Sequence, residues 1–326
     1  MENTDELLFK FKEYMKVLNR SPSTIEAYLM HVEGFLKAIE TVDMKKVKTS
    51  MIESWIEGLY AFKTNKGKPY SIYTINLKIR SIKRFFEFLE SSNLIFINPA
   101  EFIKEPKVRK DKIKPTLTPK EIKVLFDQPN LGTLRGIRDR AIMETFYATG
   151  IRLSELCGLT IFDADLQGRM LRINNGKGCK DRVVPMGKHA VKFLREYINK
   201  VRPHFTRKNR KSRHLFVGLT GAPVSDQTVN KMVRAYANQA GIKKKITPHM
   251  FRHTFATDLV RNGADIRAVQ KMLGHAELKT TEHYVRSLGL DVKKAHQKTH
   301  PREKDKEDRK DSKPNITSKK GQYGRN

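Results

Sequence analysis

Apolar residues recur at helical spacing in two stretches of the first hundred residues. The first stretch runs from Ile25 to Ile39 and the second from Ile72 to Leu89. Apolar positions three or four residues apart line one face of a helix, so the pattern predicts a helical first domain over residues 1–104. The second helix also carries a cationic face, which is either a solvated surface or a row of phosphate contacts: Lys78, Arg80, Lys83 and Arg84.

A segment rich in proline and lysine interrupts these patterns at residues 105–118. It lacks apolar periodicity, which predicts a linker between two domains. Beyond it, short β-rich runs at 170–173 and 182–185 flank a glycine-rich turn, a pattern typical of a hairpin. The predicted fold class is mainly α, with a second, mixed α+β domain over 119–290 that is mostly helical and has a small antiparallel sheet. Its helices are expected at 119–126, 137–148, 188–201, 225–240, 248–262, 264–273 and around 277–286.

Two polar segments of the chain lack these patterns. Residues 206–213, TRKNRKSR, predict a cationic loop. The basic tail over 291–326 mixes charged and small residues without apolar content, so we expect disorder over most of it. A short helix is possible where the tail begins, on the apolar residues Leu288, Leu290, Val292 and Ala295.

Net charge narrows the choice of partner. The 326 residues contain 65 Lys and Arg against 35 Asp and Glu, a formal charge of +30. Residues 105–290 contribute +21 of it (37 basic, 16 acidic), whereas residues 1–104 contribute only +3 (16 basic, 13 acidic). Such an excess favours a polyanionic partner, nucleic acid above all, over a simple aid to solubility.

Other classes of protein are disfavoured by composition. No apolar run approaches the roughly 20 residues that span a bilayer, and the N-terminus does not resemble a signal peptide. The two cysteines, Cys157 and Cys179, are too few for a disulfide scaffold or a cysteine zinc site. We therefore expect a cytoplasmic protein without a membrane partner.

Four short stretches carry side chains suited to chemistry. In the first, ATGIRLSEL, Gly150 ends one predicted helix and Leu153 begins the next. Arg152 therefore lies at a helix junction, beside backbone N–H groups that favour an anion. Glu155 follows three residues later, so a local Arg–Glu pair is the simpler alternative.

The second stretch, GKGCKDR, lies at the tip of the predicted hairpin. Glycines on both sides of Lys177 let this tip approach another surface closely, where the lysine can reach a DNA groove or donate a proton. Lys180 and Arg182 of the same hairpin are candidate DNA contacts. An ordinary solvated turn remains the alternative.

The third stretch, TPHMFRH, predicts the start of a helix. Thr247 is a good N-cap and Pro248 a good first helical residue. His249 and Arg252 then lie on one face of the first turns, where both can donate to an anion. His253 faces differently, and a packed or capping position is expected for it.

The fourth stretch joins LGH, which ends in His275, to TTEHY, which ends in Tyr284. A single tyrosine near a chain end is usually a packing residue, but the order of all these residues is specific. It resembles the motif order of the tyrosine recombinase (phage integrase) superfamily, most closely its Xer-like branch. The motifs TPHMFRHTFAT, GADIRAVQKMLGH and TTEHY are similar to the family pattern, and the resemblance extends over residues 5–290. It implies a SAM-like core-binding domain in the first part and a catalytic domain in the second, which together clamp DNA.

The resemblance also implies roles for the candidate residues at a DNA phosphodiester. Arg152 and Arg252 would hold the non-bridging oxygens, since guanidinium groups bind phosphate in a bidentate manner and keep their charge. His275 would add a hydrogen bond to the phosphate. Glu155 would orient Arg152 or His249 without contacting the phosphate itself.

The covalent step belongs by resemblance to Tyr284, which would form a 3′-phosphotyrosyl bond. A free tyrosine has a pKa of about 10, so it must lose its proton during attack, and His249 is the candidate general base. Lys177 would protonate the departing 5′ oxygen. Neither a metal ion nor another cofactor is expected, and rejoining by the 5′ hydroxyl needs no ATP.

A site-specific recombinase is the function that the resemblance implies, acting on double-stranded DNA as a tetramer on paired sites. The short helix after Tyr284 would be donated to a neighbouring protomer, and a second recombinase or an accessory protein is compatible with this assembly. Two alternatives stay open: a type IB topoisomerase-like enzyme that relaxes DNA with the same residues, and a non-catalytic DNA-binding protein. The sequence does not separate dimer resolution from element integration or transposition.

Overall fold

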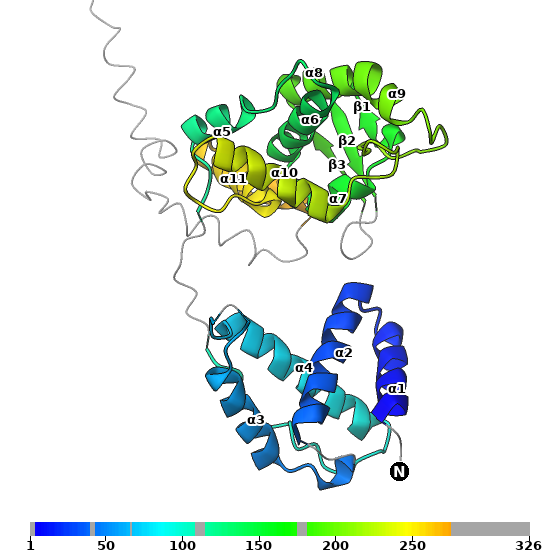
Figure 1. Cartoon of the computed structure of the whole chain (residues 1–326), viewed down its shortest axis with the longest axis vertical. Helices are drawn as coiled ribbons and strands as arrows, with labels where there is room; N and C mark the ends of the chain where they lie inside the picture. The colour runs from blue at the N-terminus through cyan, green and yellow to red at the C-terminus, as the bar shows by residue number, and fades with distance from the viewer. Residues whose placement is uncertain (1–3, 40–42, 66, 108–114, 175–180, 275–326) are drawn as a thin grey trace, which may run out of the picture. The chain divides into compact units, whose positions relative to one another are not determined.

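The computed structural model describes residues 4–39, 43–65, 67–107, 115–174 and 181–274 (Figure 1). The chain divides into two compact units, Met1–Lys112 and Ile113–Asn326. The first is helical and the second combines helices with a small antiparallel sheet, so the predicted fold class is confirmed.

The helices of the first unit share one aromatic core. Phe11 and Phe85 meet edge-on with ring centroids 5.3 Å apart, and Phe35 meets Trp55 in the same way at 5.1 Å. The sequence predicts two of these helices individually and the others only as part of a helical region. The elements described for this unit are α1 (Thr4–Val17), α2 (Pro22–Ile39), η1 (Met44–Lys46), α3 (Thr49–Ala61) and α4 (Ile72–Ser91).

In the second unit, α6 (Leu134–Thr149) runs through the core and is buried on nearly all sides. Every residue from Ala141 to Phe146 is buried, because the helix packs against α8, α11 and the sheet. The remaining helices described here are α5 (Pro119–Phe126), α7 (Leu153–Gly158), η2 (Ile161–Asp163), α8 (Lys188–Glu196), η3 (Tyr197–Val201), α9 (Arg202–Phe205), α10 (Asp226–Gln239), α11 (Pro248–Arg261) and α12 (Ile266–Leu273).

The sheet has the order β1-β2-β3, with both pairs antiparallel. β2 (Met170–Ile173) and β3 (Arg182–Pro185) are the two predicted strands, whereas the two-residue β1 (Ala164–Asp165) is too short to give an alternating pattern. Met170 pairs with Pro185 at one end of the sheet and Ile173 with Arg182 at the other. The β1–β2 turn therefore lies at the opposite end of the sheet from Ile173 and Arg182.

The predicted helix over residues 188–201 is divided. α8 ends at Glu196 and continues as the π-helical segment η3. There the buried Tyr197 accepts a hydrogen bond on its hydroxyl from the N–H of Val217 (3.1 Å). A buried tertiary contact of this kind favours a local change in helical winding.

Residues 206–213 form a loop, as predicted, and Arg202 anchors its end. The Arg202 guanidinium donates to the carbonyls of Ser212 (2.7 Å) and His214 (2.8 Å). The loop is therefore held to α9 although its own side chains are polar.

Both ends of the predicted linker contact the nearest unit. The Asn76 side chain donates to the Pro106 carbonyl (3.0 Å), and the N–H of Leu117 donates to Oγ1 of Thr254 (2.9 Å). The predicted limits at 104 and 119 remain predictions, but these contacts favour a shorter linker than 105–118.

Candidate active site

Arg152 lies at the junction between α6 and α7. α6 ends at Thr149, and Gly150 turns the chain in the left-handed conformation (φ 59°) before α7 begins. A Cβ atom at position 150 would lie 2.4 Å from Cδ1 of Phe255, so both backbone conformation and space require glycine. The Arg152 side chain stays 26% exposed, which leaves it accessible to a ligand.

Glu155, in the first turn of α7, is a carboxylate shared by two arginines. It accepts from Arg152 Nη1 and the Arg152 backbone N–H (both 2.7 Å), and from Arg182 Nη1 (3.0 Å) and Nη2 (2.7 Å). Burial opposes ionisation, but the hydrogen bonds from Arg182 and Arg152 outweigh it and lower the pKa of Glu155 to about 2. Glu155 is therefore charged at neutral pH and orients both guanidinium groups.

Arg252 reaches the same place from α11. Its side chain is buried, with the residue only 2% exposed. Nη1 donates to the carbonyl of Gly150 (2.8 Å) and Nη2 to that of Leu273 (2.6 Å). Arg252 thus ties the junction that carries Arg152 to the end of α12.

All three arginines donate hydrogen bonds to consecutive main-chain carbonyls at the end of α12. The last carbonyls of a helix lack intrahelical partners and carry the negative end of its dipole, so they favour cations. The bonds run from Arg182 Nε to Met272 O (2.8 Å), from Arg252 Nη2 to Leu273 O (2.6 Å) and from Arg152 Nη2 to Gly274 O (3.1 Å).

Gly274, which follows α12, leaves room for the Arg182 side chain. It caps α12 in the left-handed conformation (φ 63°), and a Cβ atom there would lie 3.0 Å from Nη1 of Arg182. The predicted catalytic residue His275 follows directly in sequence but lies outside the described residues. Lys177, Lys180, Tyr284 and the tail after 291 also lie outside them.

The charge of this cluster suits an anion. Arg152 and Arg182 share one carboxylate, Glu155, so their two positive charges exceed its negative charge by one, and Arg252 bonds to main-chain carbonyls beside them. Fixed guanidinium groups of this kind stabilise charge on phosphoryl oxygens without reorganising during the reaction. The described part of the candidate site is therefore a preformed cationic cluster, of which the Arg152 side chain is the most accessible.

His249 lies on the exposed surface of the first turn of α11, after Thr247 and Pro248, which start the helix as predicted. His253 is buried, in agreement with the packed position expected for it. His249 and Arg252 both lie on α11, but His249 is exposed and Arg252 is buried.

Arg182, predicted as a DNA contact in the hairpin, lies in the described structure at the start of β3. Its side chain is only 9% exposed, because Glu155 and the Met272 carbonyl hold it. The described contacts support a positioning role, and DNA contact by Arg182 stays a prediction. Sequence reasoning missed this role and the three carbonyls, since the partners are main-chain atoms or lie 27 and 90 residues away.

The four cations predicted for DNA contact on α4 have partners within the first unit. Arg80 forms an exposed ion pair with Glu105 (2.6 Å) and Lys83 donates to two carbonyls. Arg84 pairs with Glu87 (2.7 Å), and Lys78 lies over the Tyr70 ring at 5.1 Å. Their contact with DNA stays a prediction.

The described residues contain neither a metal-site cluster nor a membrane-spanning helix. No group of three or more His, Cys, Asp or Glu side chains there has the arrangement of a metal site. Across the same residues, no helix combines the length and apolar character required to cross a membrane.

Known proteins match the chain over both units. The phage integrase family matches residues 115–289, and its N-terminal SAM-like domain matches residues 8–93. Tyrosine recombinase XerC of Thermodesulfovibrio yellowstonii is 35% identical over 311 residues, which cover 94% of this chain and all of that protein. Tyrosine recombinase XerD of Staphylococcus saprophyticus is 38% identical over 224 residues, or 69% of this chain and 75% of that protein.

Solved structures agree with these matches. XerA recombinase is 30% identical with a TM-score of 0.50, over 92% of this chain and 99% of that one. A lambda integrase dimer bound to a core site has a TM-score of 0.67 at 16% identity, over 87% and 95% of the two chains, which shows a shared fold. The topoisomerase-like and non-catalytic alternatives are not favoured by these matches. The chain belongs to the phage integrase family, as an Xer-like, site-specific tyrosine recombinase.

Proposed function

We propose that the chain cuts and rejoins double-stranded DNA in the cytoplasm through a 3′-phosphotyrosyl intermediate, with Arg152 and Arg252 holding the scissile phosphate. One observation carries this proposal. Both guanidinium groups bond to adjacent carbonyls at the end of α12, directly before His275 in sequence. Two cations that are 100 residues apart in the chain are thus held together, as a single phosphate requires.

The proton transfers follow from residue chemistry. The Tyr284 oxygen attacks phosphorus while its proton passes to His249, and Lys177 gives a proton to the 5′ oxygen as the P–O bond breaks. His275 donates a hydrogen bond to the phosphate. In the reverse step a 5′ hydroxyl attacks the phosphotyrosyl bond and restores Tyr284.

A suicide substrate that traps the covalent intermediate tests this assignment. We expect the Tyr284→Phe variant to bind the site as the parent protein does and to form no protein–DNA adduct. Adducts that persist in this variant would show that Tyr284 is not the nucleophile. A matched variant, Tyr236→Phe, removes a hydroxyl bonded to Asp139 (3.0 Å) and should still form adducts.

Support for a tetramer on paired sites comes from a mainly apolar groove in the second unit. A cavity of about 480 Å³ lies between α5, α6, α8 and α11. Its lining includes the apolar Phe126, Tyr147 and Leu259 and, among polar residues, Glu144 and Asp258. We assign this groove to the apolar segment that holds Leu288 and Leu290, donated by a neighbouring protomer. Complementary apolar surfaces of this kind stabilise association between copies.

Native gels with one half-site and with paired sites test this assembly. We expect Leu259→Asp and the double change Leu288→Asp with Leu290→Asp to bind one half-site normally and to lose the paired-site complex. Loss of half-site binding in both variants would instead indicate that the segment packs within its own protomer.

A further inference from the structure

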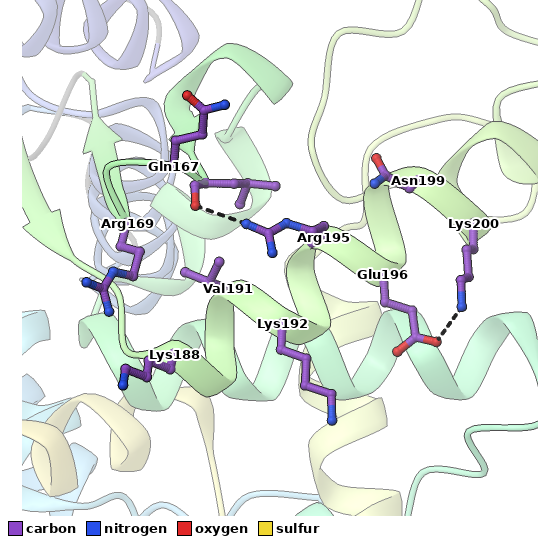
Figure 2. Close-up of a pocket in the computed structure, with 10 residues that line it drawn as sticks. Gln167, Arg169, Lys188, Val191, Lys192, Arg195, Glu196, Asn199 and Lys200 are labelled. Atoms are coloured by element: carbon purple, nitrogen blue, oxygen red, sulfur yellow. Dashed lines mark hydrogen bonds and ion pairs between the residues drawn. The ribbon is translucent and has the colours of Figure 1, made fainter.

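A cationic pocket lies in the second unit, between the β1–β2 turn and the helical run of α8 and η3 (Figure 2). The turn contributes Leu166, Gln167 and Arg169, and the helices contribute the other side. The cavity has a volume of about 700 Å³, within the range of ligand sites. Its helical lining is Lys188, Val191, Lys192, Arg195, Glu196, Asn199 and Lys200.

This pocket is separate from the arginine cluster of the active site. The β1–β2 turn is at the end of the sheet where Met170 pairs with Pro185, whereas Arg182, which binds Glu155, begins β3 at the opposite end. β2 spans four residues between them, or about 10 Å at 3.3 Å per residue. Residues of the proposed reaction therefore do not line it.

The charge of the pocket is unbalanced. Five cations line it against one carboxylate, Glu196, which is 3.5 Å from Lys200. Among the described residues, no carboxylate lies within ion-pair distance of Arg169, Lys188 or Lys192. Arg80 and Arg84 of α4 differ, since both have carboxylate partners.

The pocket also has a fixed shape and an apolar base. Val191 is 5% exposed, and Leu166 beside it is half-buried. The Asp165 carboxylate holds the turn by accepting from the N–H groups of Gln167 (3.0 Å) and Gly168 (2.8 Å). Arg195 donates to the Leu166 carbonyl (3.4 Å), which joins the turn to α8 (Figure 2).

We infer that this pocket is a docking site for an acidic segment of a partner protein. Carboxylates of such a segment would meet Lys188, Lys192 and Arg195, and an apolar side chain would cover the half-buried Leu166. A DNA backbone matches the charge, but its convex row of phosphates offers nothing to an apolar base in a concave pocket. The inference goes beyond the proposed reaction, since it concerns which protein the recombinase binds.

Binding of a short fluorescein-labelled peptide of glutamate and leucine, followed by anisotropy at physiological salt, tests the inference. We expect the double variant Lys192→Ala with Arg195→Ala to bind this peptide about tenfold more weakly, because two charge contacts are lost. The matched variant Lys120→Ala with Lys123→Ala removes the same charge from exposed positions on α5 and should bind as the parent does.

Two further measurements complete the test. A peptide with glutamine in place of glutamate should not bind, and the pocket variant should cleave the suicide substrate at the parental rate, which shows that it is folded. Equal weakening in both double variants, or binding of the glutamine peptide, would overturn the inference. Displacement of the acidic peptide by a short DNA duplex, from the parent and from the α5 variant alike, would also overturn it.

Discussion

The arginines of the active site and those of α4 both have partners within the chain, but they differ in burial. Arg252 is 2% exposed and bonds to two main-chain carbonyls, whereas the side chain of Arg80 is 57% exposed and bonds to one carboxylate. Exposed ion pairs contribute about 0–1 kcal/mol, so Arg80 can exchange Glu105 for a phosphate at little cost. The buried Arg252 is held by these two carbonyl bonds, which makes it part of a fixed frame rather than of an adaptable surface.

Replacing Arg252 should have the largest effect on both adduct formation and stability. We expect Arg252→Ala to lower the rate of adduct formation about 100- to 1000-fold, since a preorganised donor to the phosphate is lost. Two buried carbonyls also lose their partner, at about 1–3 kcal/mol each in free energy of unfolding. Suicide-substrate kinetics and urea unfolding measure the two effects, with Arg80→Ala as the exposed control. Near-parental rates in Arg252→Ala would contradict the role of this arginine.

A methyl group at position 274 should have the next largest effect. Gly274→Ala combines a left-handed backbone, which costs about 1–2 kcal/mol, with displacement of Arg182. Gly241→Ala is the matched control, because Gly241 has a similar φ (66°) and nothing within 4 Å of the added methyl. Both variants should lose thermal stability, but only Gly274→Ala should also slow adduct formation. Equal rates in the two would show that Arg182 does not position the site.

The two units should respond to acid in different pH ranges. Burial, helped by the charge of Lys78, lowers the pKa of His31 to about 4, so the first unit loses stability as pH falls from 6.5 towards 4. The lowered pKa of Glu155 stabilises the second unit above pH 4.5, and this contribution is lost as pH falls towards 2.

Urea unfolding across this pH range separates the two groups. His31→Gln should flatten the loss between pH 6.5 and 4, and Glu155→Gln should reduce the loss below pH 4.5, where Glu121, whose pKa is also lowered, still contributes. A parent protein whose stability is constant between pH 6.5 and 4 would contradict the account of His31.

The smallest effect is expected on α4. Arg80→Ala should change the free energy of unfolding by about 0–1 kcal/mol. If Arg80 contacts a phosphate in the complex, the variant should reduce the slope of log affinity against log salt by about one. Fluorescence anisotropy over a salt series measures this slope, and an unchanged slope would exclude Arg80 from the DNA interface.

Local chemistry made part of the site predictable from sequence. Gly150 before Arg152 predicts a helix junction, and Thr247 with Pro248 predicts the start of α11; the structure confirms both. The contacts that unite the site were not predictable, since a main-chain carbonyl has no sequence signature. Arg182 shows the difference, because its place in a hairpin was clear while its burial depends on α12, 90 residues away. The short β1 and the division of the 188–201 helix likewise depend on tertiary packing.

The arginines bind main-chain carbonyls at the end of α12, and this has a consequence for sequence variation. Every amino acid supplies the same carbonyl oxygen, so no point mutation at Met272 or Leu273 deletes the atom that its arginine binds. Substitutions of the exposed side chains of α12, such as Arg267 and Lys271, therefore leave these carbonyl acceptors in the chain.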